Sequence, residues 1–135
     1  MSKGQFSQKI KAFNEKALVK TQATAQTIAN ELFFSVIMDT PVLDGRLRGN
    51  WVAQNSKPFT GTIERFDKIG SETIGAILPE ISKLKLDGTI FLSNNLPYAH
   101  RIEYEGYSGK SPDGMVRKNV TRIQGIVKEE SRKAR

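Results

Sequence analysis

The stretch that decides the fold lies at residues 40–51 and reads TPVLDGRLRGNW. Thr40-Pro41 predicts the end of a preceding helix, because the residue before a proline is driven out of the helical region. Asp44-Gly45 predicts a turn, with a glycine that is free to adopt a positive φ angle. The segment is therefore expected to separate an N-terminal helical region from a body that contains strands.

The residues before this turn follow a helical pattern. Apolar residues recur at steps of three and four, which marks one face of a helix. They are Phe6, Ile10, Phe13, Ala17, Ala25, Ile28, Leu32 and Val36. One helix over Phe6 to Met38 would be about 50 Å long, whereas a compact domain of this size has a diameter of roughly 35–40 Å. Either the helix breaks in its polar middle, at residues 21–27, or one end projects and packs on another subunit.

Past the turn, short strands and helices alternate. Runs of β-branched and aromatic residues favour strands, and residues with helical spacing favour helices. The expected elements are a strand at 51–54, a short strand or loop at 60–66, a helix at 71–84 with Ser71 as N-cap, a turn at Asp87-Gly88, a strand at 89–93, a short helix at 98–104 with Pro97 at its first position, a loop at 106–114 and a helix from Met115.

The fold class predicted from these elements is α+β, in a single domain over residues 1–135. A long N-terminal helix packs on a small, mostly antiparallel sheet, with shorter helices around it. The final helix is basic and has one apolar stripe, made of Val116, Val120, Ile123 and Val127.

Several kinds of chemistry find no support in the sequence. There is no cysteine and only one histidine, His100, so neither a disulfide nor an ordinary zinc site is expected. Glu103 and Glu105 are two residues apart and would point away from each other on a helix. No apolar run has the length of a signal-peptide core or a membrane span. We expect a protein without catalytic site, cofactor or metal, neither secreted by that route nor inserted in a bilayer.

The net charge of +7 is concentrated at the C-terminal end. Residues 117–135 contain seven basic and two acidic residues, a net charge of +5, and the rest of the chain carries only +2. A basic helix of this kind is either a solvated face or a surface for nucleic acid or an acidic partner. A nucleic-acid-binding module that uses this helix is therefore the alternative function.

Two segments carry a family resemblance. The first is residues 40–51, and the second is residues 93–106, SNNLPYAHRIEYEG, followed by PDGMVR at 112–117. Their order and separation resemble those of small tailed-bacteriophage proteins called tail-component, neck or tail-completion proteins. The resemblance covers nearly the whole chain. One departure is Glu105, which displaces by one the glycine that usually follows the Glu-Tyr pair and can change the conformation of that loop.

This resemblance implies a structural protein of the virion, made in the cytoplasm of the host bacterium. Its place would be the neck between head and tail, or the head-proximal end of the tail. It would form a closed ring, expected to be a hexamer, and bind the tail tube protein and the head–tail connector proteins. The basic end could contact DNA in the channel. Segments 54–70 and 106–114 are expected to be mobile and to become ordered on assembly.

Seven residues of the two motifs are candidates for the interfaces of such a ring. Trp51 is open to two interpretations, a core anchor or a contact between subunits. Glu103 is expected to pair with an arginine, within one subunit or across two. The candidates are Arg46, Arg48, Trp51, Tyr98, Glu103, Tyr104 and Arg117.

Overall fold

The computed structural model describes residues 21–104 and 114–133. Its elements are α2 (Gln22–Met38), α3 (Arg46–Gly49), β1 (Val52–Asn55), α4 (Ser71–Ser82), β2 (Ile90–Ser93), α5 (Ala99–Tyr104) and α6 (Arg117–Lys133). The predicted α+β class is confirmed. The two strands pair antiparallel, with Val52 opposite Ser93 and Asn55 opposite Ile90. Both begin one residue later than predicted.

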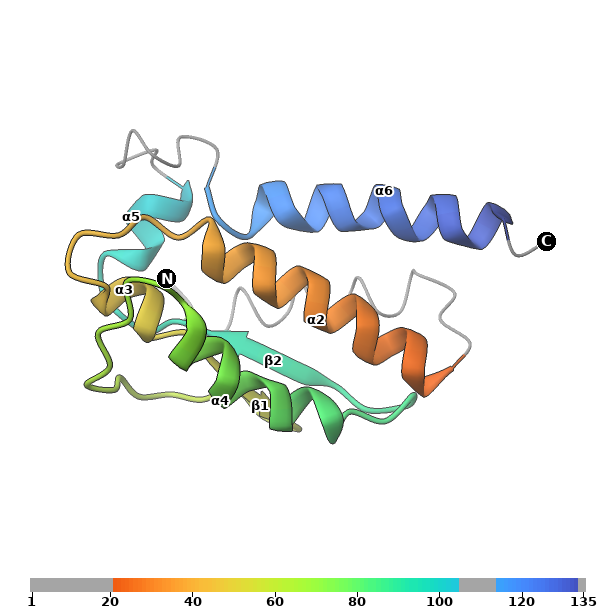
Figure 1. Ribbon diagram of the computed structural model, residues 1–135, viewed down its shortest axis with the longest axis horizontal. Helices are drawn as coiled ribbons and strands as arrows, with labels where there is room; N and C mark the ends of the chain where they lie inside the picture. Colours follow the sequence, from red (N-terminus) through yellow and green to blue (C-terminus); the bar gives the residue numbers. More distant parts are fainter. Residues whose placement is uncertain (1–20, 105–113, 134–135) are drawn as a thin grey trace.

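Helices α2 and α4 lie over one face of this small sheet, and α6 packs against α2. Figure 1 shows α2 between α4 and α6, with the strands behind α2 and α4. The short helices α3 and α5 lie at the end of the molecule where α2 stops. The arrangement brings both motifs, at 40–51 and 93–104, to the same end.

Helix α2 begins at an N-cap rather than continuing from earlier residues. Thr21 has extended backbone angles (φ −136°, ψ 154°), and its hydroxyl accepts a hydrogen bond of 3.1 Å from the Thr24 N–H. The helix that ends at Met38 therefore begins at Gln22, within the predicted polar middle, and does not run unbroken from Phe6; the earlier part of the predicted helix lies outside the described residues. At the other end α2 stops at Met38, two residues before Thr40-Pro41, as that dipeptide predicts.

The core lies between the helical layer and the sheet. Helix α2 contributes Leu32, Phe33, Val36 and Ile37, which are at most 1% exposed, because its buried positions recur at helical spacing. The predicted stripe of the last helix is confirmed: Val116 and Ile123 are buried, and Val120 and Val127 pack against the core. Met115 and Val116 form a turn before α6 rather than its first residues.

Helix α4 ends at Ser82 instead of residue 84, and its cap also differs from the prediction. The N-cap is Gly70, with a φ of +96°, and Ser71 is the first helical residue. Asp67 satisfies the free N–H groups, because its carboxylate accepts hydrogen bonds from Gly70 N at 2.8 Å and from Thr73 N and Oγ1 at 2.7 Å each. The capping side chain therefore belongs to Asp67 in the preceding loop. The prediction that Ser71 is the N-cap is wrong.

Of the remaining sequence predictions, some are confirmed and one is wrong. Residues 60–66 are a loop, which was one of the two alternatives, and a turn at 86–87 agrees with Asp87-Gly88. Pro97 precedes its helix by two residues instead of opening it, because Pro97 and Tyr98 form a turn before α5. The predicted loop at 106–114 lies outside the described residues except for Gly114.

Candidate interface residues

Trp51 is part of the core. Its side chain is 0% exposed, and its indole N–H donates a 2.8 Å hydrogen bond to the Thr40 hydroxyl. That hydroxyl donates in turn to the carbonyl of Val36, at 2.7 Å. The interpretation as an interface residue is wrong, and the interpretation as a core anchor is correct. The indole is buried beneath the end of α2, where its only polar atom finds a partner.

Arg48 is also an internal residue, only 9% exposed. Its guanidinium donates to three carbonyl oxygens: Lys68 at 2.6 Å, Met38 at 2.9 Å and Thr40 at 3.1 Å. The Met38 carbonyl is at the end of α2, the Thr40 carbonyl is in the loop that follows α2, and the Lys68 carbonyl is in the loop before α4. Arg48 therefore holds the two loops together, and the prediction that it lies at an interface is wrong.

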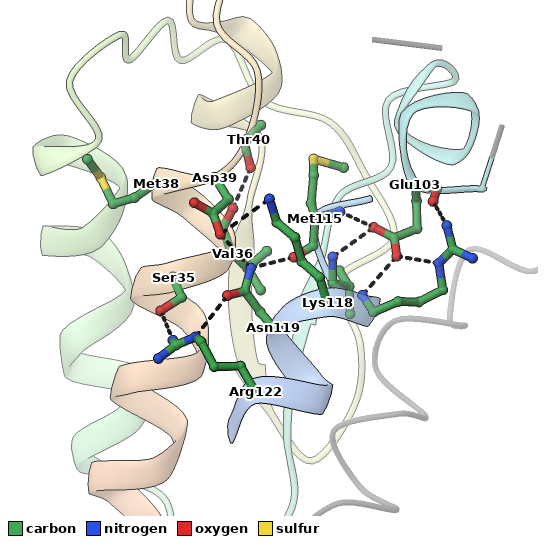
Figure 2. Close-up of polar contacts among 12 residues, drawn as sticks. Ser35, Val36, Met38, Asp39, Thr40, Glu103, Met115, Lys118, Asn119 and Arg122 are labelled. Carbon is green, nitrogen blue, oxygen red and sulfur yellow. Dashed lines mark hydrogen bonds and ion pairs between the residues drawn. The ribbon is translucent and has the colours of Figure 1, made fainter. Parts of the chain in front are cut away.

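Glu103 is buried completely and caps the start of α6. One carboxylate oxygen accepts from the backbone N–H of Met115 at 2.6 Å and of Val116 at 2.7 Å. The other accepts from Arg117, at 2.9 Å from its backbone N–H and 3.0 Å from Nε (Figure 2). The expected arginine partner is Arg117 of the same chain, so Glu103 itself is not a surface residue. A carboxylate at the positive end of a helix is also favoured by the helix dipole.

Tyr104 and Arg117 extend this network toward the surface. The Arg117 guanidinium lies 4.8 Å from the centre of the Tyr104 ring, and the His100 ring lies at the same distance on Tyr104. Tyr104 is half-buried and packs against the core, whereas the Arg117 side chain is 42% exposed. Both residues therefore have an internal role, and Arg117 keeps an accessible edge.

Arg46 and Tyr98, like Arg117, keep part of their side chains on the surface, each 36% exposed. Arg46 lies 4.0 Å from the exposed carboxylate of Glu64. Partial burial raises the pKa of Tyr98, with the Arg46 charge acting against this and the Asp44 charge adding to it. The guanidinium, the phenol and the carboxylates thus form one polar surface at the α3–α5 end.

The segment at 54–70 is anchored rather than loose. The side-chain amide of Asn50 donates to the Ile63 carbonyl at 3.0 Å and accepts from the Ile63 N–H at 2.9 Å, and the Asn95 side chain donates to the carbonyls of Phe59 and Gly61. Arg65 donates to the carbonyls of Gly49 and Trp51, at 2.8 and 2.9 Å. The expectation of a mobile segment does not fit these contacts, since side chains from both motifs hold it in place.

The first turns of the basic helix α6 are joined to α2. Lys118 lies 3.7 Å from the Asp39 carboxylate, which also accepts a 2.8 Å hydrogen bond from Asn119. Arg122 donates to the hydroxyl of Ser35 (Figure 2). Part of the basic charge that suggested a nucleic-acid surface is therefore used to hold two helices together.

Sequence reasoning missed a different set of surface residues. Large apolar side chains are exposed on α2, on α4 and on the two loops that Arg48 joins. They are Leu43 at 92%, Ile69 at 75%, Phe66 at 52%, Phe34 at 51%, Leu78 at 45% and Met38 at 38%. Single exposed apolar residues are ordinary, but several on neighbouring elements point to an interaction surface. The sequence did contain one signal of this surface, because Leu43 is an apolar residue in the middle of a predicted turn.

Catalytic and membrane features can be assessed only for the described part of the chain. In residues 21–104 and 114–133 no group of three or more histidine or acidic side chains is placed to hold a metal ion. No helix in these ranges is long and apolar enough to cross a membrane. Comparison of the chain with family models, curated proteins and solved structures gives no match.

Proposed function

We propose that this protein is a non-enzymatic structural subunit of a tailed-bacteriophage neck or head-proximal tail end, and that it acts by assembling into a ring. The proposal starts from the resemblance of segments 40–51 and 93–106 to small neck and tail-completion proteins. The observation that carries it is the pair of loops joined by Arg48, which present Leu43 and Ile69 with 92% and 75% of their surface exposed.

Anchoring of these loops supports a role in association. The three hydrogen bonds from Arg48 fix the loop backbones before any partner is present, so less conformational entropy is lost on binding. An apolar side chain as exposed as Leu43 gains free energy when a partner covers it, by about 25 cal/mol per Å². A preformed loop with an apolar tip is therefore suited to docking.

The roles of the other motif residues fit the same proposal. Trp51 and Glu103 are buried and fully engaged, and their contacts hold the end of α2 and the start of α6. These are positions that shape a surface rather than perform a reaction. The mechanism proposed is association of different patches on neighbouring copies, because a closed ring requires heterologous interfaces. The tail tube protein and a connector protein are the proposed further partners.

The alternative, a nucleic-acid-binding module, depends on the basic end of the chain. Lys118 and Arg122 have partners on α2, and Arg117 has one in Glu103, so their charges are partly balanced within the subunit. Lys128 is exposed on the described part of α6. Contact of this end with DNA inside a ring is compatible with the proposal.

The experiment that tests the proposal is the mass of the full-length protein by light scattering, over a series of concentrations. The series is repeated at low and high salt and with duplex DNA. We expect a discrete ring mass that DNA leaves unchanged. A monomer that gains mass only with DNA, and loses it steeply with added salt, would instead support the nucleic-acid-binding alternative.

A further inference from the structure

A wider apolar surface extends from Ile69, in the loop before α4, over α2 and α4. It consists of Phe34, Met38, Ile69, Ile74 and Leu78, and is called the α2–α4 face below. Ile69 is 75% exposed, Phe34 51%, Leu78 45% and Met38 38%, and Ile74 is partly buried against the core.

Two contacts show how α2 and α4 lie beside each other. The Gln26 side chain donates to the carbonyls of Ser82 and Leu84, and Met38 Sδ lies 2.9 Å from where a Cβ on Gly70 would be. The start of α2 thus lies at the end of α4 and its end at the start of α4, so the helices are antiparallel neighbours (Figure 1).

Helix geometry places the exposed side chains beside that contact. Residues at steps of four drift by about 40° around a helix. The row that starts at Gln26, which touches α4, therefore reaches Phe34 and then Met38 as it turns toward solvent. On α4, Leu78 lies one turn after Ile74, which packs against the core.

We infer that the α2–α4 face of one subunit receives residues 6–17 of a second copy, an inference that rests on the proposed ring function. In this segment Phe6, Ile10, Phe13 and Ala17 recur at steps of four, three and four, the spacing of one helical face. Such a stripe needs an apolar surface to cover it, and the α2–α4 face needs an apolar occupant.

Charge complementarity favours the same occupant. Residues 1–20 contain five lysines and one glutamate, a net charge of +4. Residues 21–104 contain eight basic and nine acidic residues, a net charge of −1. Glu31, three residues before Phe34 on α2, is an exposed carboxylate at the rim of the face. The part of the receiving subunit that carries this face, residues 21–104, therefore does not repel the lysines of the segment, and the basic helix α6 packs on the other side of α2 (Figure 1).

The distances favour a second copy over the same chain. Helix α2 begins at the Thr21 cap and so does not itself continue into the segment. If the segment of the same chain reversed at Thr21, its 12 residues would span about 17 Å of α2, whereas Met38 lies about 24 Å from Gln22. The stripe would end near Phe34 and leave Met38 and Ile69 exposed. A segment from a neighbour has no such tether and can cover the whole face.

A pair of full-length variants tests this interface. The segment variant carries Ile10→Glu and Phe13→Glu, and the face variant carries Phe34→Glu and Leu78→Glu. We expect each alone to lose the ring mass and remain monomeric, with a concentration for half-assembly raised at least about tenfold. Leu86→Glu is the matched control, because Leu86 is a 43% exposed leucine in the turn after α4, and it should keep the ring mass.

Mixing the two variants provides the decisive measurement. The segment variant retains an intact face and the face variant an intact segment, so an equimolar mixture should form a complex of two chains, one of each variant. Its formation would exclude trivial unfolding as the cause of lost assembly. Thermal unfolding of each variant is measured beside it, and midpoints close to wild type are expected.

Several outcomes would overturn the inference. A wild-type ring whose mass survives both variants, or a mixture that stays monomeric, excludes this interface and leaves the ring proposal standing. Variants with unchanged mass and a lower unfolding midpoint show that the segment covers the face of its own chain. A wild-type protein that is monomeric at every concentration contradicts the ring proposal, and this interface with it.

Discussion

Trp51 donates its indole N–H to the hydroxyl of Thr40 at 2.8 Å, so the first and last residues of the 40–51 turn are joined in the core. Thr40 is 1% exposed and Trp51 is 0% exposed. The hydrogen bond closes the turn around Arg48, whose guanidinium also binds the Thr40 carbonyl. One buried contact therefore helps to set the shape of the loop that carries Leu43.

Trp51→Ala is expected to lower the free energy of unfolding of the monomer by about 3–5 kcal/mol, because it opens a large cavity in the core. Thr40→Val should cost about 1–3 kcal/mol, since the indole N–H then lacks an acceptor. Urea denaturation of both variants measures these values. A Trp51→Ala monomer as stable as wild type would contradict the assignment of Trp51 to the core.

Arg48→Lys is expected to destabilise the protein by about 1–3 kcal/mol. A lysine ammonium cannot reproduce the fork that donates to three carbonyls from two directions. Amide hydrogen exchange should rise at residues 40–45 and 66–70, which the guanidinium joins. Arg46→Lys is the control, because Arg46 is partly exposed, and its effect should stay within about 0.5 kcal/mol. Equal effects of the two substitutions would argue against the role of Arg48 in holding the two loops together.

Glu103→Ala is expected to cost about 2–4 kcal/mol, because three backbone N–H groups at the start of α6 lose their acceptor. Glu103→Gln should cost less, since its one carbonyl oxygen still accepts. Loss of far-ultraviolet circular dichroism from α6 would accompany the alanine variant. Glu31→Ala, at an exposed position, provides the comparison and should be nearly neutral. An Ala variant as stable as this control would show that the cap is dispensable.

The Asp67 carboxylate should make stability depend on pH. Burial acts to raise its pKa, but hydrogen bonds from Thr73 and Gly70 and the charge of Arg65 outweigh burial and hold the pKa below its ordinary value of 3.8. A carboxylate with a lowered pKa stabilises the folded state fully above the unfolded pKa, and this stabilisation is lost as pH falls.

The difference in unfolding free energy between wild type and Asp67→Asn is therefore expected to be largest at neutral pH and to shrink below about pH 4. Urea denaturation at a series of pH values from 7 to 2.5 measures it. Glu64→Gln, which alters an exposed carboxylate in the same loop, is the control and should show little pH dependence. A wild-type advantage over Asp67→Asn that grows in acid would contradict the assignment.

Leu43→Ser tests the proposed docking loop without disturbing the core. Leu43 is 92% exposed, so the free energy of unfolding of the monomer should change by less than about 0.5 kcal/mol. Ring assembly in light scattering should weaken, because the apolar tip is lost. Leu86→Ser serves as its control. Full assembly of the Leu43→Ser variant would remove this loop from the interface.

Local patterns in the sequence determined the α+β class, the end of α2 before Pro41, the two short strands and the apolar stripe of α6. These features depend on helical or alternating spacing and on the restricted backbone of proline, and both act within a few residues. They are readable without knowing which distant segments meet.

Only the tertiary structure decided where the motif side chains point. Tryptophan, arginine and glutamate suit both an interface and a buried polar contact, so their types did not distinguish the two. Arg48 finds its partners at Met38, Thr40 and Lys68, and Glu103 finds its own at the start of α6. Those backbone groups are brought close only when the helices pack on the sheet, because the free energy of burying a charged group depends on partners that the folded chain supplies.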